Sequence, residues 1–229
     1  MNAVVYYSNT GESKRISEFV AKNTGYPCFD IFELSFSKFD TLALVFPVYC
    51  QNIPAAVWRF LNSVSAKRLV LVATYGKMSY GNVLWEIQNK TSHNVIAAAY
   101  VPTKHSYLEN DSRFENFEAL KPILNKIASD CNECVKIKKS FKNPFASFFK
   151  DWRSRIGVKI YKDKKCDNCG VCAEVCKSSA IKNGKTDRRC IRCLKCVNEC
   201  PRAALHFKLS PLMRTYLSKN KKNELKIFV

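Results

Sequence analysis

The chain has 229 residues, of which 47% are hydrophobic and 25% charged, and its formal net charge is +19 at pH 7. A chain of this length can bury one large core or two smaller ones. No stretch approaches the roughly 18 consecutive apolar residues that a membrane span needs, and no signal peptide opens the sequence. We therefore exclude a membrane-spanning protein and expect a cytoplasmic one.

Residues 1–130 alternate strand-like and helix-like segments, the pattern of a parallel sheet covered by helices. The expected strands are residues 3–7, 28–32, 41–46, 68–74 and 94–101. The expected helices are residues 12–23, a helix that opens at Pro54, residues 80–89, and a last helix that Asp111 caps and Pro122 kinks. This count predicts an α/β fold with a flavodoxin-like five-stranded parallel sheet.

After this region the composition changes to basic residues interleaved with aromatic ones. The aromatic residues at helical spacing are Phe145, Phe148, Phe149 and Trp152. That spacing is typical of a helix docked on a domain or, as the alternative, of a helix on a membrane surface. We expect residues 1–135 as a first domain, 136–157 as a linker, 158–209 as a second domain and 210–229 as a basic C-terminal tail.

Eight of the 12 cysteines form two runs with the same spacing. The first run is Cys166, Cys169, Cys172 and Cys176. The second run is Cys190, Cys193, Cys196 and Cys200, followed by Pro201. Each run has the ligand spacing of a bacterial two-cluster 4Fe-4S protein, in which the fourth cysteine of one run ligates the other cluster. We therefore assign Cys166, Cys169, Cys172 and Cys200 to cluster one, and Cys190, Cys193, Cys196 and Cys176 to cluster two.

Two zinc sites are the alternative for these cysteines, although zinc ligands come in separated pairs rather than in full runs of four. Both runs resemble those of bacterial two-cluster ferredoxins over about residues 158–207, including a hairpin turn at Asn183 and Gly184. Lys177 departs from the proline that this family usually has after the first run. The resemblance implies a second, small α+β ferredoxin domain that binds two 4Fe-4S clusters.

The turn after the first strand has the residues of a phosphate site. It runs Ser8, Asn9, Thr10, Gly11, Glu12 and Ser13. A phosphate needs backbone N–H groups at a helix N-terminus, hydroxyl donors and a glycine that allows close approach. The turn resembles the phosphate loop of flavodoxins, with Glu12 and Ser13 where that family often has Asn and Thr.

Two later segments fall where flavodoxin-like proteins contact the flavin ring, after the third and fourth strands. The candidate residues of the first are Pro47, Val48, Tyr49, Cys50, Gln51 and Asn52. Those of the second are Thr74, Tyr75, Gly76, Tyr80 and Gly81. Tyrosine rings suit a flat heteroaromatic ligand, and we expect one or two of the three tyrosines to touch it.

The whole chain resembles flavodoxin-ferredoxin fusion proteins of anaerobic microbes over about residues 2–207. The resemblance implies FMN and an electron-transfer role between the clusters and the flavin. Two alternatives are an FMN-dependent reductase of a small acceptor and a ferredoxin whose flavodoxin-like domain only docks a partner. No catalytic residue is expected, because no recognisable catalytic motif is present.

The positive charge lies mainly in the C-terminal part. Residues 1–130 hold 13 Lys and Arg against 11 Asp and Glu, whereas residues 131–229 hold 25 against 8. Such a segment attracts acidic partners by long-range steering. We expect redox partner proteins with acidic surfaces, no nucleic acid, and at most weak contact with a membrane surface.

Two further cysteines, Cys131 and Cys134, are separated by two residues. This spacing suits a redox pair or half of a zinc site, but no second pair accompanies it. Surface or linker cysteines are the third interpretation, and the sequence favours it.

Overall fold

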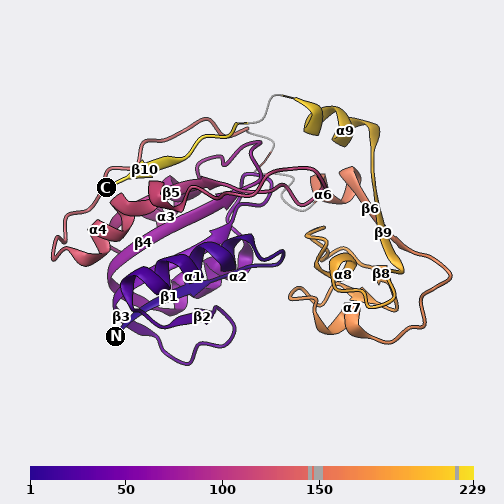
Figure 1. Ribbon diagram of the computed structural model, residues 1–229, viewed down its shortest axis with the longest axis horizontal. Helices are drawn as coiled ribbons and strands as arrows, with labels where there is room; N and C mark the ends of the chain where they lie inside the picture. The colour runs from indigo at the N-terminus through magenta and orange to yellow at the C-terminus, as the bar shows by residue number, and fades with distance from the viewer. Residues whose placement is uncertain (144–145, 147–151, 220–221) are drawn as a thin grey trace. The chain divides into compact units, whose positions relative to one another are not determined.

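The computed structural model describes residues 1–143, 146, 152–219 and 222–229, which belong to two compact units (Figure 1). The first unit contains residues 1–143 and 222–229, and the second contains residues 144–221. The chain thus leaves the first unit, builds the second and returns to the first. The aromatic stripe predicted at positions 145, 148, 149 and 152 lies outside the described side chains. Among the described residues, no helix is long and apolar enough to cross a membrane.

A six-stranded sheet forms the middle of the first unit, in the order β10-β5-β4-β3-β1-β2. Its strands are β1 (Asn2–Tyr6), β2 (Cys28–Asp30), β3 (Lys38–Pro47), β4 (Ser65–Tyr75), β5 (Val95–Pro102) and β10 (Lys226–Phe228). The first five are parallel and β10 is antiparallel to β5. Their order, 2-1-3-4-5, is that of flavodoxin-like folds. The predicted α/β sheet is therefore confirmed, with a sixth strand that the sequence did not indicate.

Helices cover both faces of this sheet because its central strands are apolar on both faces. Helices α1 (Glu12–Thr24) and α4 (Lys121–Ala128) pack on the face that carries Val4 and Val45. Helices α2 (Ala55–Ser63) and α3 (Val83–Lys90) pack on the face that carries Val5 and Leu44. The carboxyl ends of the parallel strands consequently share one edge of the sheet, where the loops after β1, β3 and β4 meet.

The last predicted helix of the first unit is shorter than expected. The 3-10 helix η1 (Phe117–Leu120) leads into α4, and Pro122 lies in the first turn of α4. A proline in that position removes no helical hydrogen bond, so no kink results. Asp111 caps no helix, because its carboxylate is buried and paired with Lys77. An acidic residue before an apolar run resembles an N-cap, but a distant partner sets its role here.

Strand β10 comes from the segment that was predicted as a basic tail. Ile227 pairs with Ala99 of β5, so the C-terminal strand covers an edge that would otherwise be open (Figure 1). The Tyr75 hydroxyl holds the same segment. It accepts the Glu224 N–H at 3.2 Å and lies 2.7 Å from the Glu224 carbonyl and 3.0 Å from the Lys222 carbonyl.

We predict that Tyr75→Phe loosens this C-terminal segment. The change removes hydrogen bonds worth about 1–2 kcal/mol in total, so the amides of residues 222–229 should exchange faster in hydrogen–deuterium exchange. Burial raises the pKa of Tyr75 from 10.0 to about 12. The wild type should therefore lose stability as the pH rises between these values, and Tyr75→Phe should lose less. Tyr26→Phe is the control, and equal exchange in both variants would contradict the prediction.

The second unit is small and built from short elements. They are α6 (Trp152–Gly157), β6 (Val158–Lys162), α7 (Val171–Glu174), β7 (Ile181–Lys182), β8 (Lys185–Thr186), α8 (Lys195–Asn198), β9 (Leu205–Leu209) and α9 (Pro211–Ser218). Strand β6 pairs antiparallel with β9, and β7 with β8. Asn183 and Gly184 have φ values of 50° and 73°, which confirms the predicted hairpin turn.

Candidate functional site

The turn between β1 and α1 has the geometry of an anion cradle. Gly11 caps α1 with φ 90°, and its N–H donates to the Ser8 hydroxyl at 3.1 Å. A Cβ placed on Gly11 would find no atom within 4 Å, so the space beside the helix N-terminus is open. Backbone N–H groups, hydroxyls and open space at a helix N-terminus are the features that bind phosphate.

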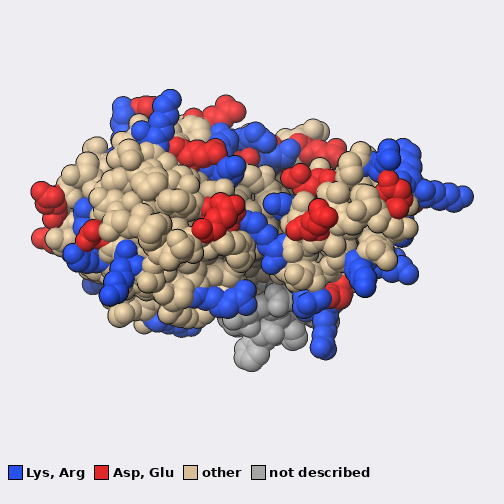
Figure 2. All heavy atoms as spheres, turned by 90° about the horizontal axis from the view of Figure 1, so that it is seen from below, with Lys and Arg blue, Asp and Glu red and all other residues tan. Residues whose placement is uncertain are grey.

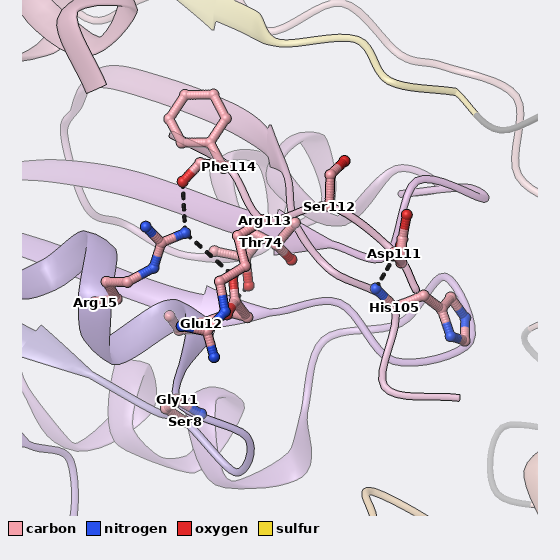
Figure 3. Close-up of polar contacts among 12 residues, drawn as sticks. Ser8, Gly11, Glu12, Arg15, Thr74, His105, Asp111, Ser112, Arg113 and Phe114 are labelled. Atoms are coloured by element: carbon pink, nitrogen blue, oxygen red, sulfur yellow. Dashed lines mark hydrogen bonds and ion pairs between the residues drawn. The ribbon is translucent and has the colours of Figure 1, made fainter. Parts of the chain in front are cut away.

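The Glu12 carboxylate of this turn forms ion pairs with two arginines. Arg113 Nε lies 3.2 Å from Glu12 Oε1, and Arg15 Nη2 lies 3.4 Å from Glu12 Oε2 (Figure 3). Arg15 also donates to the Phe114 carbonyl. One carboxylate therefore meets two guanidinium groups, and the local charge is positive rather than negative. Sequence patterns did not indicate Arg113, which lies about a hundred residues away along the chain.

Two hydrogen bonds tie this turn to the neighbouring loops. The Ser13 hydroxyl lies 2.9 Å from the Thr74 hydroxyl at the end of β4. Asn9 donates through Nδ2 to the Tyr49 hydroxyl at 2.8 Å and to the Tyr7 hydroxyl at 3.0 Å. The three segments that the sequence singled out are thus brought together at one edge of the sheet.

The loop after β3 contains a tight turn in an unusual conformation. Tyr49 and Asn52 pair with each other, and the two residues between them, Cys50 and Gln51, have φ values of 49° and 66°. Residues other than glycine and asparagine rarely adopt this left-handed backbone conformation. Such conformations cluster at ligand sites. The turn is placed by Val48, whose N–H donates to the Thr74 carbonyl at 2.7 Å.

The loop after β4 packs against this turn. Gly81 has φ 60°, and a Cβ placed on it would lie 2.8 Å from the Gln51 Cβ. Tyr75 and Tyr80 are both buried, and the Tyr80 ring stacks on Tyr100 with centroids 3.9 Å apart. Of the three tyrosines considered for a flat ligand, only Tyr49 is partly exposed. Gly76 faces the His105 ring rather than open space.

A buried ion pair also holds the loop that follows β4. Lys77, at φ 56°, is 3% exposed, and its ammonium lies 3.2 Å from Asp111 Oδ1 and 2.6 Å from the Ser112 hydroxyl. Asp111 Oδ2 accepts the His105 N–H at 2.8 Å (Figure 3). The pair links the loop after β4 to the segment that follows β5. Sequence patterns could not have found it, because neither residue belongs to a motif.

In the second unit, four of the candidate ligand cysteines line one cavity. They are Cys166, Cys169, Cys172 and Cys200. The fourth cysteine at this cavity therefore comes from the second run. Arg202, also at this cavity, pairs with Asp167 at 2.9 Å and joins the two runs.

Cysteines of both runs influence the buried thiols of the second run. Burial, followed by the charges of Cys193, Cys190, Cys176 and Cys172, raises the pKa of Cys196 to about 12. Burial also raises the pKa of Cys193 to about 11, against the lowering effect of the Lys195 backbone N–H and with contributions from Cys190 and Cys176. Cys196 is therefore within electrostatic range of cysteines from both runs.

The two cysteine runs share the same left-handed backbone positions. Residues at equivalent positions have left-handed φ values: Asn168 and Arg192 at 59°, Gly170 at 88° and Leu194 at 65°, Ser179 at 47° and Ala203 at 45°. The Ala180 N–H donates to Cys176 Sγ, and the Ala204 N–H donates to Cys200 Sγ, each at 3.3 Å. One loop is thus built twice, and N–H groups that face sulfur stabilise thiolates.

The described residues contain no group of three or more His, Cys, Asp or Glu side chains arranged to hold a metal ion. The donor set at the cavity nevertheless fits a cluster, since four cysteine thiolates are what a 4Fe-4S cubane requires.

No family model matches the chain, and no curated protein matches it. Solved structures similar to it include the following two. One is a candidate flavoprotein from Bacteroides uniformis, with 16% identity, a TM-score of 0.40 and coverage of 54% of this chain and 97% of that one. The other is a short-chain flavodoxin associated with a bacterial microcompartment, with 14% identity, a TM-score of 0.43 and coverage of 56% and 95%. The flavodoxin-like assignment of the first unit rests on its strand order.

Proposed function

We propose that this chain is an electron-transfer protein that passes electrons between two 4Fe-4S clusters in its second unit and an FMN in its first unit. The observation that carries the proposal is the duplicated cysteine loop, which brings the first three cysteines of one run and the last of the other around one cavity. This crossed arrangement is the ligation pattern of two-cluster ferredoxins. The ferredoxin domain would lie within residues 158–209.

The chain's own residues would hold the clusters and set their surroundings. Cluster one would take Cys166, Cys169, Cys172 and Cys200, and cluster two would take Cys190, Cys193, Cys196 and Cys176. The N–H groups of Ala180 and Ala204 would stabilise two of the sulfur ligands. When bound, the clusters supply one-electron transfer, and hydrogen bonds to sulfur tune their potential.

The FMN would lie at the shared edge of the sheet, as ligands do in open α/β folds. Its phosphate would bind the Ser8–Ser13 turn, where Arg15 and Arg113 offset the charge of Glu12. The loops at Pro47–Asn52 and Thr74–Gly81 would flank the ring, and Tyr49 would be its aromatic contact. Tyr75, Gly76 and Tyr80 would hold the second loop in place from the protein interior. When bound, FMN supplies one- or two-electron chemistry, and the chain binds and orients it.

The surface charge supports acidic redox proteins as partners. In Figure 2, separate groups of Lys and Arg side chains are scattered over the visible face, with Asp and Glu among them. A net charge of +19, lowered by the negative charge of two clusters, still leaves a basic protein that steers acidic partners toward it. We propose no role for nucleic acid.

Cofactor analysis tests the core of this proposal. Protein purified without oxygen should contain about eight iron atoms with matching sulfide, FMN, and no stoichiometric zinc. Zinc in place of iron would contradict the cluster assignment. Clusters without flavin would instead favour the alternative in which the first unit only docks a partner.

We predict that Gly11→Ala weakens FMN binding by at least about tenfold, because a Cβ would enter the open space at the phosphate turn. Gly25→Ala is a matched control. Gly25 ends the same helix with φ 70°, and a Cβ placed on it would likewise find no atom within 4 Å. Both changes should cost about 1–2 kcal/mol of stability through backbone strain. Flavin fluorescence titration of both variants measures the difference, and equal affinities would place the phosphate elsewhere.

A further inference from the structure

Two cysteines that the proposed function does not use, Cys131 and Cys134, follow α4 in the sequence. Cys131 is partly buried and Cys134 is exposed, and both are free thiols. They are separated by Asn132 and Glu133, the spacing found in redox-active dithiols. They belong to the first unit, whereas the eight candidate ligand cysteines belong to the second unit.

A cation faces one of the two thiols. Lys126 Nζ, in the last turn of α4, lies 3.1 Å from Cys131 Sγ. The backbone N–H of Glu133 and then Lys126 lower the pKa of Cys131, against partial burial and the Glu133 charge. The nearby Arg68 donates to the Lys126 carbonyl at 2.8 Å and so offsets the negative end of α4. A thiol in such positive surroundings is a stronger nucleophile at neutral pH.

The segment around the pair makes at least four polar contacts with its surroundings. Asn94 Nδ2 donates to the Asn132 carbonyl at 2.6 Å, and the Val135 N–H donates to the Val95 carbonyl at 2.9 Å. Gln88 Nε2 lies 3.4 Å from Cys134 Sγ, and its Oε1 accepts the Ile137 N–H at 3.1 Å. The second thiol is thus presented on a segment fixed on both sides.

We propose that Cys131 and Cys134 form a redox-active dithiol whose oxidant is a small-molecule disulfide. The Cys131 thiolate attacks one sulfur of the disulfide, which forms a mixed disulfide and releases one thiolate. Cys134 then gives up its proton and attacks Cys131 Sγ, which forms the Cys131–Cys134 bond and releases the second thiolate. The pair loses two electrons and two protons, and the oxidant becomes two thiols. This site does not depend on the flavin or cluster assignments.

The first test uses oxidised glutathione as the disulfide. Cofactor-loaded protein is incubated with it without oxygen, quenched with acid, alkylated and mapped by peptide mass spectrometry. We expect a peptide in which residues 131 and 134 are linked, lighter by two hydrogen atoms. Cys134→Ser should accumulate glutathione on Cys131, whereas Cys131→Ser should not accumulate it on Cys134. Absence of the linked peptide in excess oxidant would overturn the proposal.

The second test addresses the role of Lys126. In the dithiol protein, Lys126→Gln should slow the alkylation of Cys131 by iodoacetamide at pH 7 roughly three- to tenfold. Lys121→Gln, in the same helix with Glu118 as its partner, should leave the rate unchanged. Cys28, whose pKa is raised by burial, serves as a slow internal reference. Equal rates for Cys131 and Cys28, or no effect of Lys126→Gln, would show that Cys131 is an ordinary thiol. An unchanged circular dichroism spectrum and urea unfolding midpoint show that each variant has folded.

Discussion

In the proposed ligation, replacing Cys200 with alanine should remove the cluster that Cys166, Cys169 and Cys172 would hold and leave the other in place. Cys200 lines the cavity of the first three cysteines, although it is the last cysteine of the second run. A cubane that loses one of four thiolate ligands in this small unit should be lost, so iron should fall from about eight atoms to about four. Cys28→Ala removes a thiol that donates a hydrogen bond to the Ser17 hydroxyl, and this variant should keep all of the iron.

Double variants show which cluster was lost. If the ligation is crossed, Cys200→Ala combined with Cys172→Ala damages one cluster twice and keeps about four iron atoms. Cys200→Ala combined with Cys196→Ala damages both clusters and loses nearly all of the iron. Uncrossed ligation would reverse the two results. Iron and sulfide per protein, together with low-temperature EPR after reduction, separate the outcomes.

Replacing Asp111 with alanine should destabilise the first unit by about 3–5 kcal/mol, because it leaves the Lys77 ammonium buried without its carboxylate. Both side chains are almost inaccessible, at 4% and 3% exposure, so water cannot replace the lost partner. The change also removes the acceptor of the His105 N–H. Urea unfolding followed by circular dichroism measures the loss.

Two variants sharpen the Asp111 experiment. Glu118→Ala breaks the exposed Lys121–Glu118 pair and should cost less than about 1 kcal/mol. Asp111→Ala combined with Lys77→Met removes both charges and should recover part of the stability, since no unpaired charge remains. If Asp111→Ala costs no more than Glu118→Ala, the buried pair does not hold the loop.

Local patterns predicted the parts of the fold that depend on nearby residues. The apolar run that became β3 needs no partner to be recognised, because a strand buried on both faces is apolar throughout. The cysteine runs can be read locally for a similar reason, since in two-cluster ferredoxins three ligands of each cluster come from one short loop; the ligation in this chain stays a prediction. The Asn183–Gly184 turn likewise needs only its own two residues.

Features set by distant partners could not be predicted. The apolar residues of strand β10 are Ile227 and Phe228, and the segment before them is rich in lysine. No strand-like hydrophobic pattern therefore indicated its pairing with β5. Tyr75 and Tyr80 were considered as ring contacts, but the C-terminal segment and Tyr100 bury them. Arg113 and Asp111 act through Glu12 and Lys77, and nothing in their neighbourhood along the chain indicates those pairings.

The return of the chain to β10 determines how this protein can be cut apart. Truncation at residue 143 would remove β10, expose the edge of β5 and free the Tyr75 hydroxyl, so the remaining piece would be a damaged version of the first unit. A deletion of residues 144–221, with residue 143 joined to residue 222 by a flexible linker, would instead keep β10 in the first unit. The same arrangement means that one proteolytic nick between the units leaves the other covalent connection intact. Because both connections belong to one chain, the proposed exchange of electrons between clusters and flavin would be first order and independent of protein dilution.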